Sequence, residues 1–341
     1  MHQVPTVRAR RKDVAELAGV SAAVVSYVLN NGPRPVASAT RERVLNAIEE
    51  LNYRPNATAR ALKLQRTNVI GLLVPDISNP YFAEFAKVVQ EACFTRGYAL
   101  IVADSSIDEG REAAQVRALF ERQVDGVIDY GVQDTTLLSL LTGADVPIVS
   151  MDSQMESPQI PTVAIDDYAA SRDAVTHLVS HGHTRIGYIG GPRDVPVSRA
   201  RYRGWRDVMV ENSPDTDLES LVINPPFSRA GGAAGATELL SRELPPTALF
   251  IASDLQAMGS LYACAVMGLI VPDDVALISF DGTQETEYSV PPLTVVKQPV
   301  GELARTAVAR VLATDRTAGA SRTIIPHSIV LRRSCGCEAP A

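Results

Sequence analysis

Residues 13–30 read DVAELAGVSAAVVSYVLN, and this stretch decides the fold of the N-terminal part of the chain. Apolar residues recur at helical spacing on both sides of Gly19, and glycine readily takes the left-handed conformation that ends a helix. Ser21 is a favourable N-cap for the second helix. Two helices joined by a turn of about three residues predict a helix-turn-helix.

A third helix is predicted over residues 40–51, where apolar side chains again form one stripe. Three short helices can enclose a small core. The expected core residues are Val14, Leu17, Val25, Val28, Val44 and Ile48. Residues 52–56 contain a proline that stops the third helix, and residues 57–65 are too few to form a stable helix alone.

Charge is divided unevenly along the chain. The 341 residues carry a net charge of −7, which by itself argues against a polyanionic partner. Residues 1–66, however, hold 11 Lys and Arg against five Asp and Glu, so this head is +6 and the remainder is −13. The asymmetry suggests that the head alone binds nucleic acid, although charge leaves equal room for a solvated basic face without a partner.

From residue 69 onward, short apolar runs alternate with helical stretches. Strands are predicted at residues 69–74, 98–103, 124–129 and 147–151, and in a second series at 185–190, 221–223, 248–251 and 275–280. Helices are predicted between them, among others at 80–96, 108–123 and 134–142. This alternation in two halves predicts two parallel, doubly wound sheets, whose ligand crevice lies at the carboxyl ends of the strands.

Several motifs in one register resemble the LacI/GalR family of bacterial repressors. They lie at residues 13–21, 25–30, 40–44, 53–56, 71–82, 124–126, 181–187, 201–205 and 279–281. The resemblance implies an α plus α/β protein: a helix-turn-helix head in residues 1–54, a hinge helix in 55–67, and a two-lobed body in 68–341 like periplasmic sugar-binding proteins. It also implies a homodimer that binds a pseudopalindromic double-stranded DNA operator, most often as a repressor.

The second helix of a helix-turn-helix enters the major groove. Ala22, Ala23 and Tyr27 match the family's specificity positions, where longer polar or basic side chains are usual. Two alanines offer only apolar contacts to bases, and Tyr27 offers one hydroxyl, so base readout should be weak. The alternative is that the alanines only favour helix formation and make no contact with DNA. DNA shape and phosphate contacts should therefore contribute more. The phosphate contacts are expected from Arg10, Arg11, Lys12, Ser21 and Asn30.

Residues 56–62 match the family's hinge helix, which would fold only against DNA and its dimer mate. We expect Leu62 to wedge between base pairs in the minor groove, with Asn56 and Ala59 lining the same groove. The alternative is that Leu62 is a linker residue packed on the body.

The effector site should gather polar and aromatic residues that follow the strands. The candidates are Asn79, Tyr81, Phe82, Asp129, Asp152, Arg201, Phe227, Ser253 and Asp281. By resemblance, Arg201 and Asp281 are anchoring positions and Phe227 is an aromatic wall; a surface ion pair and a helix N-cap are the alternatives for the first two. Aromatic plates beside charged groups suit a polyhydroxylated ring, so a sugar is expected ahead of a nucleoside.

Other classes of site and function lack their sequence signals. His177 and His181 are four residues apart, but no cysteine or carboxylate lies near them in sequence, and Cys335-x-Cys337 is only half a four-ligand set, so no metal or cofactor is expected. No nucleophile elbow, P-loop or dinucleotide fingerprint occurs, so no enzyme activity is expected.

A stand-alone binding protein of the periplasmic type is the rival interpretation. It would need an export signal, whereas the N-terminus has positive charges without an apolar core. No apolar run long enough for a transmembrane helix occurs, and the four cysteines do not form a disulfide framework. We therefore expect a cytoplasmic protein with no membrane partner.

Overall fold

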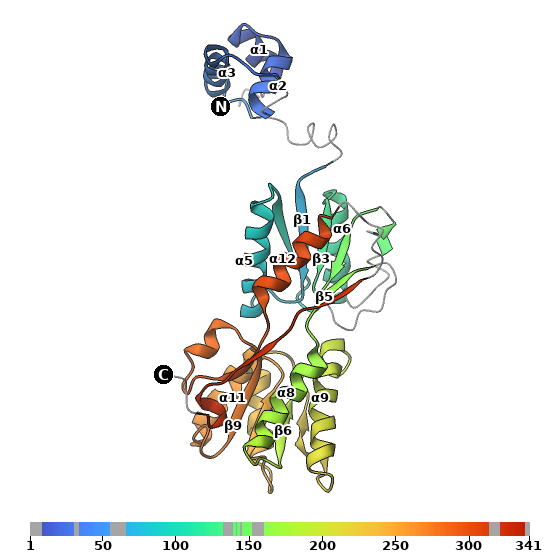
Figure 1. Cartoon of the computed structure of the whole chain (residues 1–341), viewed down its shortest axis with the longest axis vertical. Coiled ribbons are helices and arrows are strands. Elements are labelled where there is room, and N and C mark those ends of the chain that lie inside the picture. The colour runs from blue at the N-terminus through green and yellow to red at the C-terminus, as the bar shows by residue number, and fades with distance from the viewer. Residues whose placement is uncertain are drawn as a thin grey trace, which may run out of the picture. The chain divides into compact units, whose positions relative to one another are not determined.

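The computed structural model describes residues 9–30, 34–54, 66–131, 139–140, 142–143, 145–151, 160–313 and 321–337. The chain divides into two units, Met1–Thr67 and Asn68–Ala341, and each is described by itself (Figure 1). In the described part of the chain, no helix is both long and apolar enough to cross a membrane.

The first unit is a three-helix head, as predicted. Its helices are α1 (Arg11–Ala18), α2 (Ala22–Asn30) and α3 (Ser38–Glu50). Gly19 has a φ of +64° and ends α1 in the left-handed conformation that the sequence indicated. Arg41 on α3 donates from Nη1 to the carbonyl oxygen of Val28 at 3.4 Å, which ties α3 to α2.

The core of the head differs from the prediction at one position. Val14, Val25 and Val44 are fully buried, but Leu17 is 47% exposed and does not belong to the core. The inner face of α1 is formed by Val14 and Ala18, four residues apart, together with Ala15, so Leu17 falls outside that face. Ala15 and Ala18 are buried on this face beside Val14.

The second unit contains two lobes, each built on a six-stranded sheet. The first lobe has β1 (Val69–Val74), β2 (Ala99–Asp104), β3 (Gly126–Asp129), β4 (Ile148–Ser150), β5 (Thr162–Ala164) and β11 (Arg322–Ile324). Their order is β11-β5-β4-β3-β1-β2, and every pair is parallel. Alternate side chains of β1 face opposite layers: Ile70 and Leu72 pack with α5 (Pro80–Phe94) and α12 (Val300–Val311), and Leu73 packs with α6 (Glu109–Glu121).

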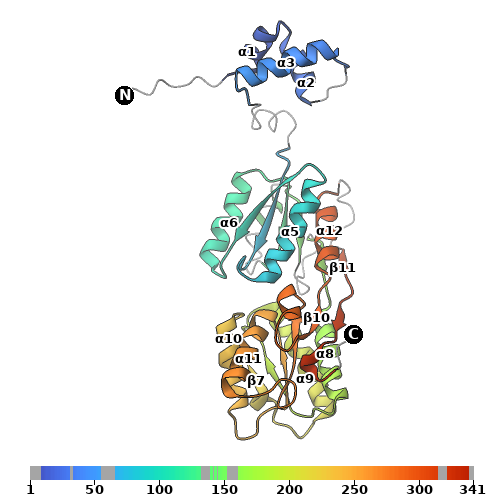
Figure 2. The ribbon, with the colours of Figure 1, turned by 90° about the vertical axis from the view of Figure 1, so that its left-hand side faces the viewer.

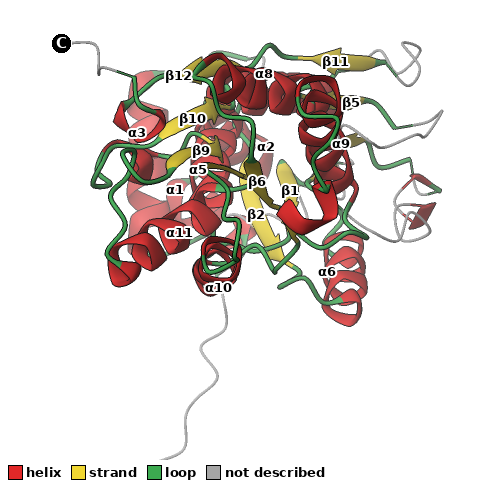
Figure 3. Cartoon of the chain, turned by 90° about the horizontal axis from the view of Figure 1, so that it is seen from below, coloured by secondary structure: helices red, strands yellow, loops and turns green. Residues whose placement is uncertain are grey.

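The second lobe repeats this plan. Its strands are β6 (Ile186–Ile189), β7 (Val222–Ile223), β8 (Ala248–Ile251), β9 (Ala276–Asp281), β10 (Thr294–Lys297) and β12 (Ser328–Val330), in the order β12-β10-β9-β8-β6-β7. Only β12 runs antiparallel to its neighbour among these described strands. Helices α8 (Asp167–Ser180) and α9 (Pro196–Asn212) cover one face, and α10 (Arg229–Leu240) and α11 (Asp254–Met267) cover the other (Figure 3).

The chain passes between the lobes after β5, after β10 and between β11 and β12 (Figure 2). The predicted doubly wound body is therefore confirmed, and the eight predicted strands correspond to β1–β4 and β6–β9 within a few residues. Strands β5, β10, β11 and β12 were not predicted, and most of the predicted helix 134–142 lies outside the described residues.

Candidate functional site

A cavity of about 400 Å³ lies at the carboxyl ends of the strands, between the two lobes of the body. Seven residues expected at the effector site line it: Asn79, Tyr81, Phe82, Arg201, Phe227, Ser253 and Asp281. The topology thus brings together residues that lie more than two hundred positions apart in the sequence.

An aromatic group forms the first-lobe side of this cavity. Tyr81 and Phe82 lie in the first turn of α5, and Tyr130 directly follows β3. The ring centroids of Phe82 and Tyr130 are 5.0 Å apart in an edge-to-face arrangement. The hydroxyls of Tyr81 and Tyr130 are hydrogen-bonded to each other, and burial raises the pKa of Tyr81 well above its usual value. Both phenols are therefore neutral hydrogen-bonding groups at physiological pH.

Arg201 is the charged centre of the second-lobe side. It is 6% exposed, its Nε donates to Oδ1 of Asp167 at 3.0 Å, and its Nη1 lies 3.7 Å from Oδ1 of Asp281. Its Cζ is 3.7 Å from the ring centroid of Phe280, a cation–π distance. Burial lowers the pKa of Arg201, but the two carboxylates outweigh burial and raise it, so the guanidinium stays charged. Arg201 forms its ion pairs in the interior, so the alternative that it makes a surface ion pair is wrong.

Asp281 lies beside Arg201 in a strained backbone conformation. Its φ is +118°, a region that non-glycine residues rarely occupy and that costs about 1–3 kcal/mol. Burial raises the pKa of Asp281 to about 7, against the opposing effect of Arg201. Its Oδ1 accepts a hydrogen bond from Nε2 of Gln298 at 2.9 Å. Backbone strain of this kind concentrates at ligand sites. Asp281 does not lie at the start of a helix, so the alternative that it is a helix N-cap is wrong.

A chain of polar contacts connects the two lobes across the cavity. Tyr81 of the first lobe donates from its hydroxyl to Oε1 of Gln298 at 2.9 Å, and Gln298 lies in the segment that leaves β10. Gln298 in turn donates to Asp281, which contacts Arg201 of the second lobe. A ligand that replaces any member of this chain alters the contacts between the lobes.

Phe227 forms an apolar wall opposite the aromatic group, and its position depends on a glycine. A Cβ atom on Gly191 would lie 2.1 Å from the Phe227 ring, so only glycine allows the ring to lie against this backbone. The Gly190-Gly191-Pro192 turn after β6 therefore positions the wall.

Two of the predicted cavity residues also cap helices. Oγ of Ser253 accepts from the backbone N–H of Gln256 at the start of α11, and Oδ1 of Asn79 accepts from the backbone N–H of Tyr81 at the start of α5. The Ser253 hydroxyl therefore already has a structural partner, which limits its part in ligand recognition.

Asp129, which was also expected at the effector site, does not line the cavity described. Asp129 ends β3 fully buried and is not among the described residues that line the cavity. Since successive side chains of a strand point to opposite faces, Tyr130 faces the cavity and Asp129 faces away. Asp152 lies outside the described residues.

Sequence reasoning missed Tyr130, Asp167 and Gln298 in the cavity. Tyr130 was one residue beyond a predicted strand end. Asp167 and Gln298 follow β5 and β10, which are too short or too weakly patterned for the sequence to reveal.

The described residues that the sequence predicts to contact DNA lie on α1, α2 and the turn between them, apart from Arg10, which directly precedes α1. Ala22 and Ala23 in the first turn of α2 are exposed, Tyr27 is half-buried, and Arg10, Arg11, Lys12 and Ser21 are exposed nearby. Oγ of Ser21 accepts a weak hydrogen bond from the backbone N–H of Val24 at 3.4 Å. The side chain of Asn30, and the whole of Asn56, Ala59 and Leu62, lie outside the described residues.

Comparison with known proteins adds matches over nearly the whole chain. A family model for bacterial regulatory proteins of the lacI family matches residues 12–56, and one for a periplasmic binding protein-like domain matches residues 175–335. The HTH-type transcriptional regulator DegA of Bacillus subtilis is 35% identical over 335 residues, which cover 94% of this chain and 96% of that one.

A second relative and a solved structure agree with these matches. The HTH-type transcriptional repressor PurR of Aliivibrio salmonicida is 35% identical over 303 residues, which cover 87% of this chain and 89% of that one. The crystal structure of the lac repressor dimer bound to operator and the anti-inducer ONPF has a TM-score of 0.84 at 26% identity, covering 96% of this chain and 99% of that one.

Proposed function

We propose that this chain, which belongs to the LacI family of bacterial regulatory proteins, represses transcription under the control of a small polyhydroxylated effector. Like the relatives it matches, it is a DNA-binding transcriptional regulator and not an enzyme. It represses transcription as a homodimer on a pseudopalindromic operator in the cytoplasm, where bacterial DNA lies. We assign residues 1–54 to DNA binding, 55–67 to the hinge, and 68–341 to effector binding and dimerisation. The cavity between the lobes is the observation that carries the effector assignment.

The arrangement of the cavity supports a sugar as effector. An apolar wall at Phe227 and the aromatic group of Phe82 and Tyr130 can cover the faces of a ring. The guanidinium of Arg201 has five N–H donors, of which hydrogen bonds to described residues use two. Arg201 and Asp281 together provide a donor and an acceptor for adjacent hydroxyls. A purine is the second candidate, favoured by the similarity to repressors named PurR.

The proposed control works through linkage between the two sites. An effector that contacts both ends of the Tyr81–Gln298–Asp281 chain binds one arrangement of the lobes better than the other. This difference in affinity is the free energy available to change how the two hinge segments of a dimer meet DNA.

Exposed apolar residues support the homodimer. Phe94 at the end of α5 is 75% exposed, and Tyr262 and Val266 on α11 are each 68% exposed. Helices α5 and α11 lie on the same side of the body (Figure 2). The exposed apolar side chains of α5 and α11 make this side of the body the proposed dimer surface.

In the head, the proposed DNA contacts remain those that the sequence predicted. Ala22, Ala23 and Tyr27 face base edges, while the basic residues at the start of α1 meet phosphates. With so few base-specific hydrogen bonds, operator affinity should depend strongly on salt.

The test combines a ligand screen with a DNA-binding assay on the full chain. Thermal unfolding is recorded with monosaccharides, disaccharides, nucleosides and purine bases, because a ligand that binds the folded state raises the melting temperature. Any ligand found is then added to the chain bound to fluorescent DNA from upstream of its own gene. We expect a sugar to stabilise the body and to change DNA affinity. Stabilisation by a purine alone would contradict the sugar assignment, and the absence of salt-dependent binding to any palindromic DNA would contradict the regulator.

A further inference from the structure

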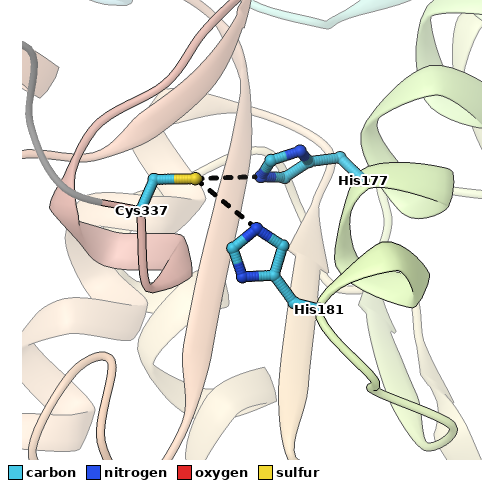
Figure 4. Close-up of side chains that lie close together, drawn as sticks. All are labelled: His177, His181 and Cys337. Carbon is cyan, nitrogen blue, oxygen red and sulfur yellow. Dashed lines mark hydrogen bonds between the residues drawn. The ribbon is translucent and has the colours of Figure 1, made fainter.

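Three potential metal ligands meet on the second lobe, away from the cavity. His177 lies in the last turn of α8, His181 caps that helix, and Cys337 follows the short helix η3 (Arg333–Cys335). Sγ of Cys337 is 3.6 Å from Nε2 of His177 and 3.5 Å from Nε2 of His181 (Figure 4). The ligand atoms of all three lie within 4.8 Å of one another.

These distances match those of a bound tetrahedral ion. A zinc ion about 2.0–2.1 Å from a histidine nitrogen and about 2.3 Å from a cysteine sulphur, at a tetrahedral angle, separates the two ligand atoms by about 3.5 Å. Both nitrogen–sulphur separations in the cluster are within 0.1 Å of this value. A second thiol, Cys335, has its Sγ 3.4 Å from Nε2 of His177 but is not one of the three residues whose ligand atoms all lie within 4.8 Å of one another, so the fourth position of the ion would be open to solvent.

The sequence builds this cluster from two parts. The spacing of four residues places His177 and His181 on the same face of α8, with their ring centroids 4.6 Å apart. The C-terminal segment is fixed independently: Oγ of Ser334 donates to the carbonyl oxygen of Leu277 at 2.7 Å, and Oγ1 of Thr294 donates to Sγ of Cys335 at 3.0 Å. The side chains are therefore positioned before any ion binds.

The turn at Gly336 completes the geometry. Its φ is +91°, which an L-residue rarely adopts, and the turn brings Cys337 back toward the two imidazoles. His181 is exposed and Cys337 is partly exposed, so an ion can reach the cluster from solvent.

We propose that His177, His181 and Cys337 form a binding site for a borderline-soft divalent metal ion of the Zn²⁺ type. Imidazole and thiolate ligands together select zinc-like ions over Mg²⁺ or Ca²⁺, which prefer oxygen. The bound ion ties the C-terminal segment to the end of α8. The sequence argued against a metal because no cysteine lies near these histidines along the chain, but the fold brings Cys337 to them from 156 and 160 residues away.

Metal binding requires neutral imidazoles and a thiolate, and this requirement sets the pH of the test. Burial, together with the neighbouring His181, lowers the pKa of His177. Burial and the hydrogen-bonded Cys335 raise the pKa of Cys337 to about 11, so metal binding must displace a thiol proton. The titration is therefore best done at mildly alkaline pH.

The test is a Co²⁺ and Zn²⁺ titration of the untagged full chain, stripped with a chelator and kept reduced. We expect one equivalent of Co²⁺ to give the visible bands of a tetrahedral ion and a thiolate-to-cobalt absorption, and Zn²⁺ to displace it and raise the melting temperature. The variants His181→Ala and Cys337→Ser should bind Co²⁺ at least about 100-fold more weakly. Losing a residue that only orients a metal ligand weakens metal binding by about 10–100-fold, and losing the ligand itself should cost more.

The control is His183→Ala, a change to a histidine two residues beyond the cluster whose Nδ1 lies 2.9 Å from Oγ1 of Thr247. It should bind the metal as the unmodified chain does. The melting temperatures of the metal-free variants show that each is folded. Absence of the thiolate band in the reduced chain, or equal binding by Cys337→Ser and the unmodified chain, would overturn the proposal.

Discussion

Replacing Arg201 by methionine tests the energetics of the cavity most directly. The change keeps most of the apolar stem but removes the only charge that lies between Asp167 and Asp281 among the described residues. Both carboxylates are buried, with side chains 7% exposed, so they would be left without compensation. Removing one partner of a buried ion pair lowers the free energy of unfolding by about 3–5 kcal/mol, because the other charge stays buried without a partner. We expect a loss of stability of this size.

The chain provides its own probe for this measurement. Trp205 is the single tryptophan, is fully buried on α9 and lies four residues after Arg201. Its fluorescence during urea unfolding therefore reports on the second lobe. With a denaturant dependence of about 2–3 kcal/mol per molar urea, a loss of about 3–5 kcal/mol should lower the unfolding midpoint by about 1–2.5 M.

A matched control separates charge burial from any general effect on α9. Arg199 is exposed two residues earlier on the same helix, and Arg199→Met should change the free energy of unfolding by less than about 0.5 kcal/mol. If Arg201→Met were no more damaging than Arg199→Met, the buried ion pairs would not stabilise this lobe and the reasoning would be refuted.

The stability loss in Arg201→Met should also depend on pH in a definite direction. The pKa of Asp281 is raised from 3.8 to about 7, so in the unmodified chain its stabilising contribution is present below about pH 4 and is lost as the pH rises to about 7. Removing Arg201 penalises only the ionised carboxylate. The loss of stability in Arg201→Met should therefore be larger at about pH 8 than at about pH 6, and the opposite order would contradict the assignment of Asp281.

Three further changes test the ligand and DNA sites. Phe227→Ala removes the apolar wall and should weaken effector binding by about two- to tenfold in calorimetry, since an aromatic contact contributes about 0.5–1.5 kcal/mol; unchanged affinity would exclude the ring as a contact. Gly191→Val should abolish effector binding, because its Cβ would displace Phe227; retained binding would show that the wall tolerates movement. Leu62→Ala should lower operator affinity at least about tenfold in fluorescence anisotropy while leaving effector binding intact, and equal operator affinity would contradict the wedge.

The sequence predicted well wherever the deciding interactions are local. Gly19 and the cap at Ser21 define the turn of the helix-turn-helix within a few residues, and so the head could be predicted from residues 13–30. Even in the head, the exposure of Leu17 could not be predicted from the sequence. The face of α1 that points inward depends on how the three helices pack.

In the body, too, the sequence revealed only those site residues that follow strands with a clear local pattern. Strands with long apolar runs such as β1 and β8 were predicted, and the residues after them were found with them. The three residues of β5 become a strand only by pairing with β4 and β11, so Asp167 could not be placed in the cavity from the sequence.

The sequence by itself determined the order of the elements, the division of charge and the family, because periodicity, capping and motif spacing are properties of neighbouring residues. Only the tertiary structure decided what meets across that order. It set Arg201 between two carboxylates, joined Tyr81 to Asp281 through Gln298, and brought Cys337 to His177 and His181. These contacts arise from the pairing of distant strands and the path of the C-terminal segment, which no local pattern specifies.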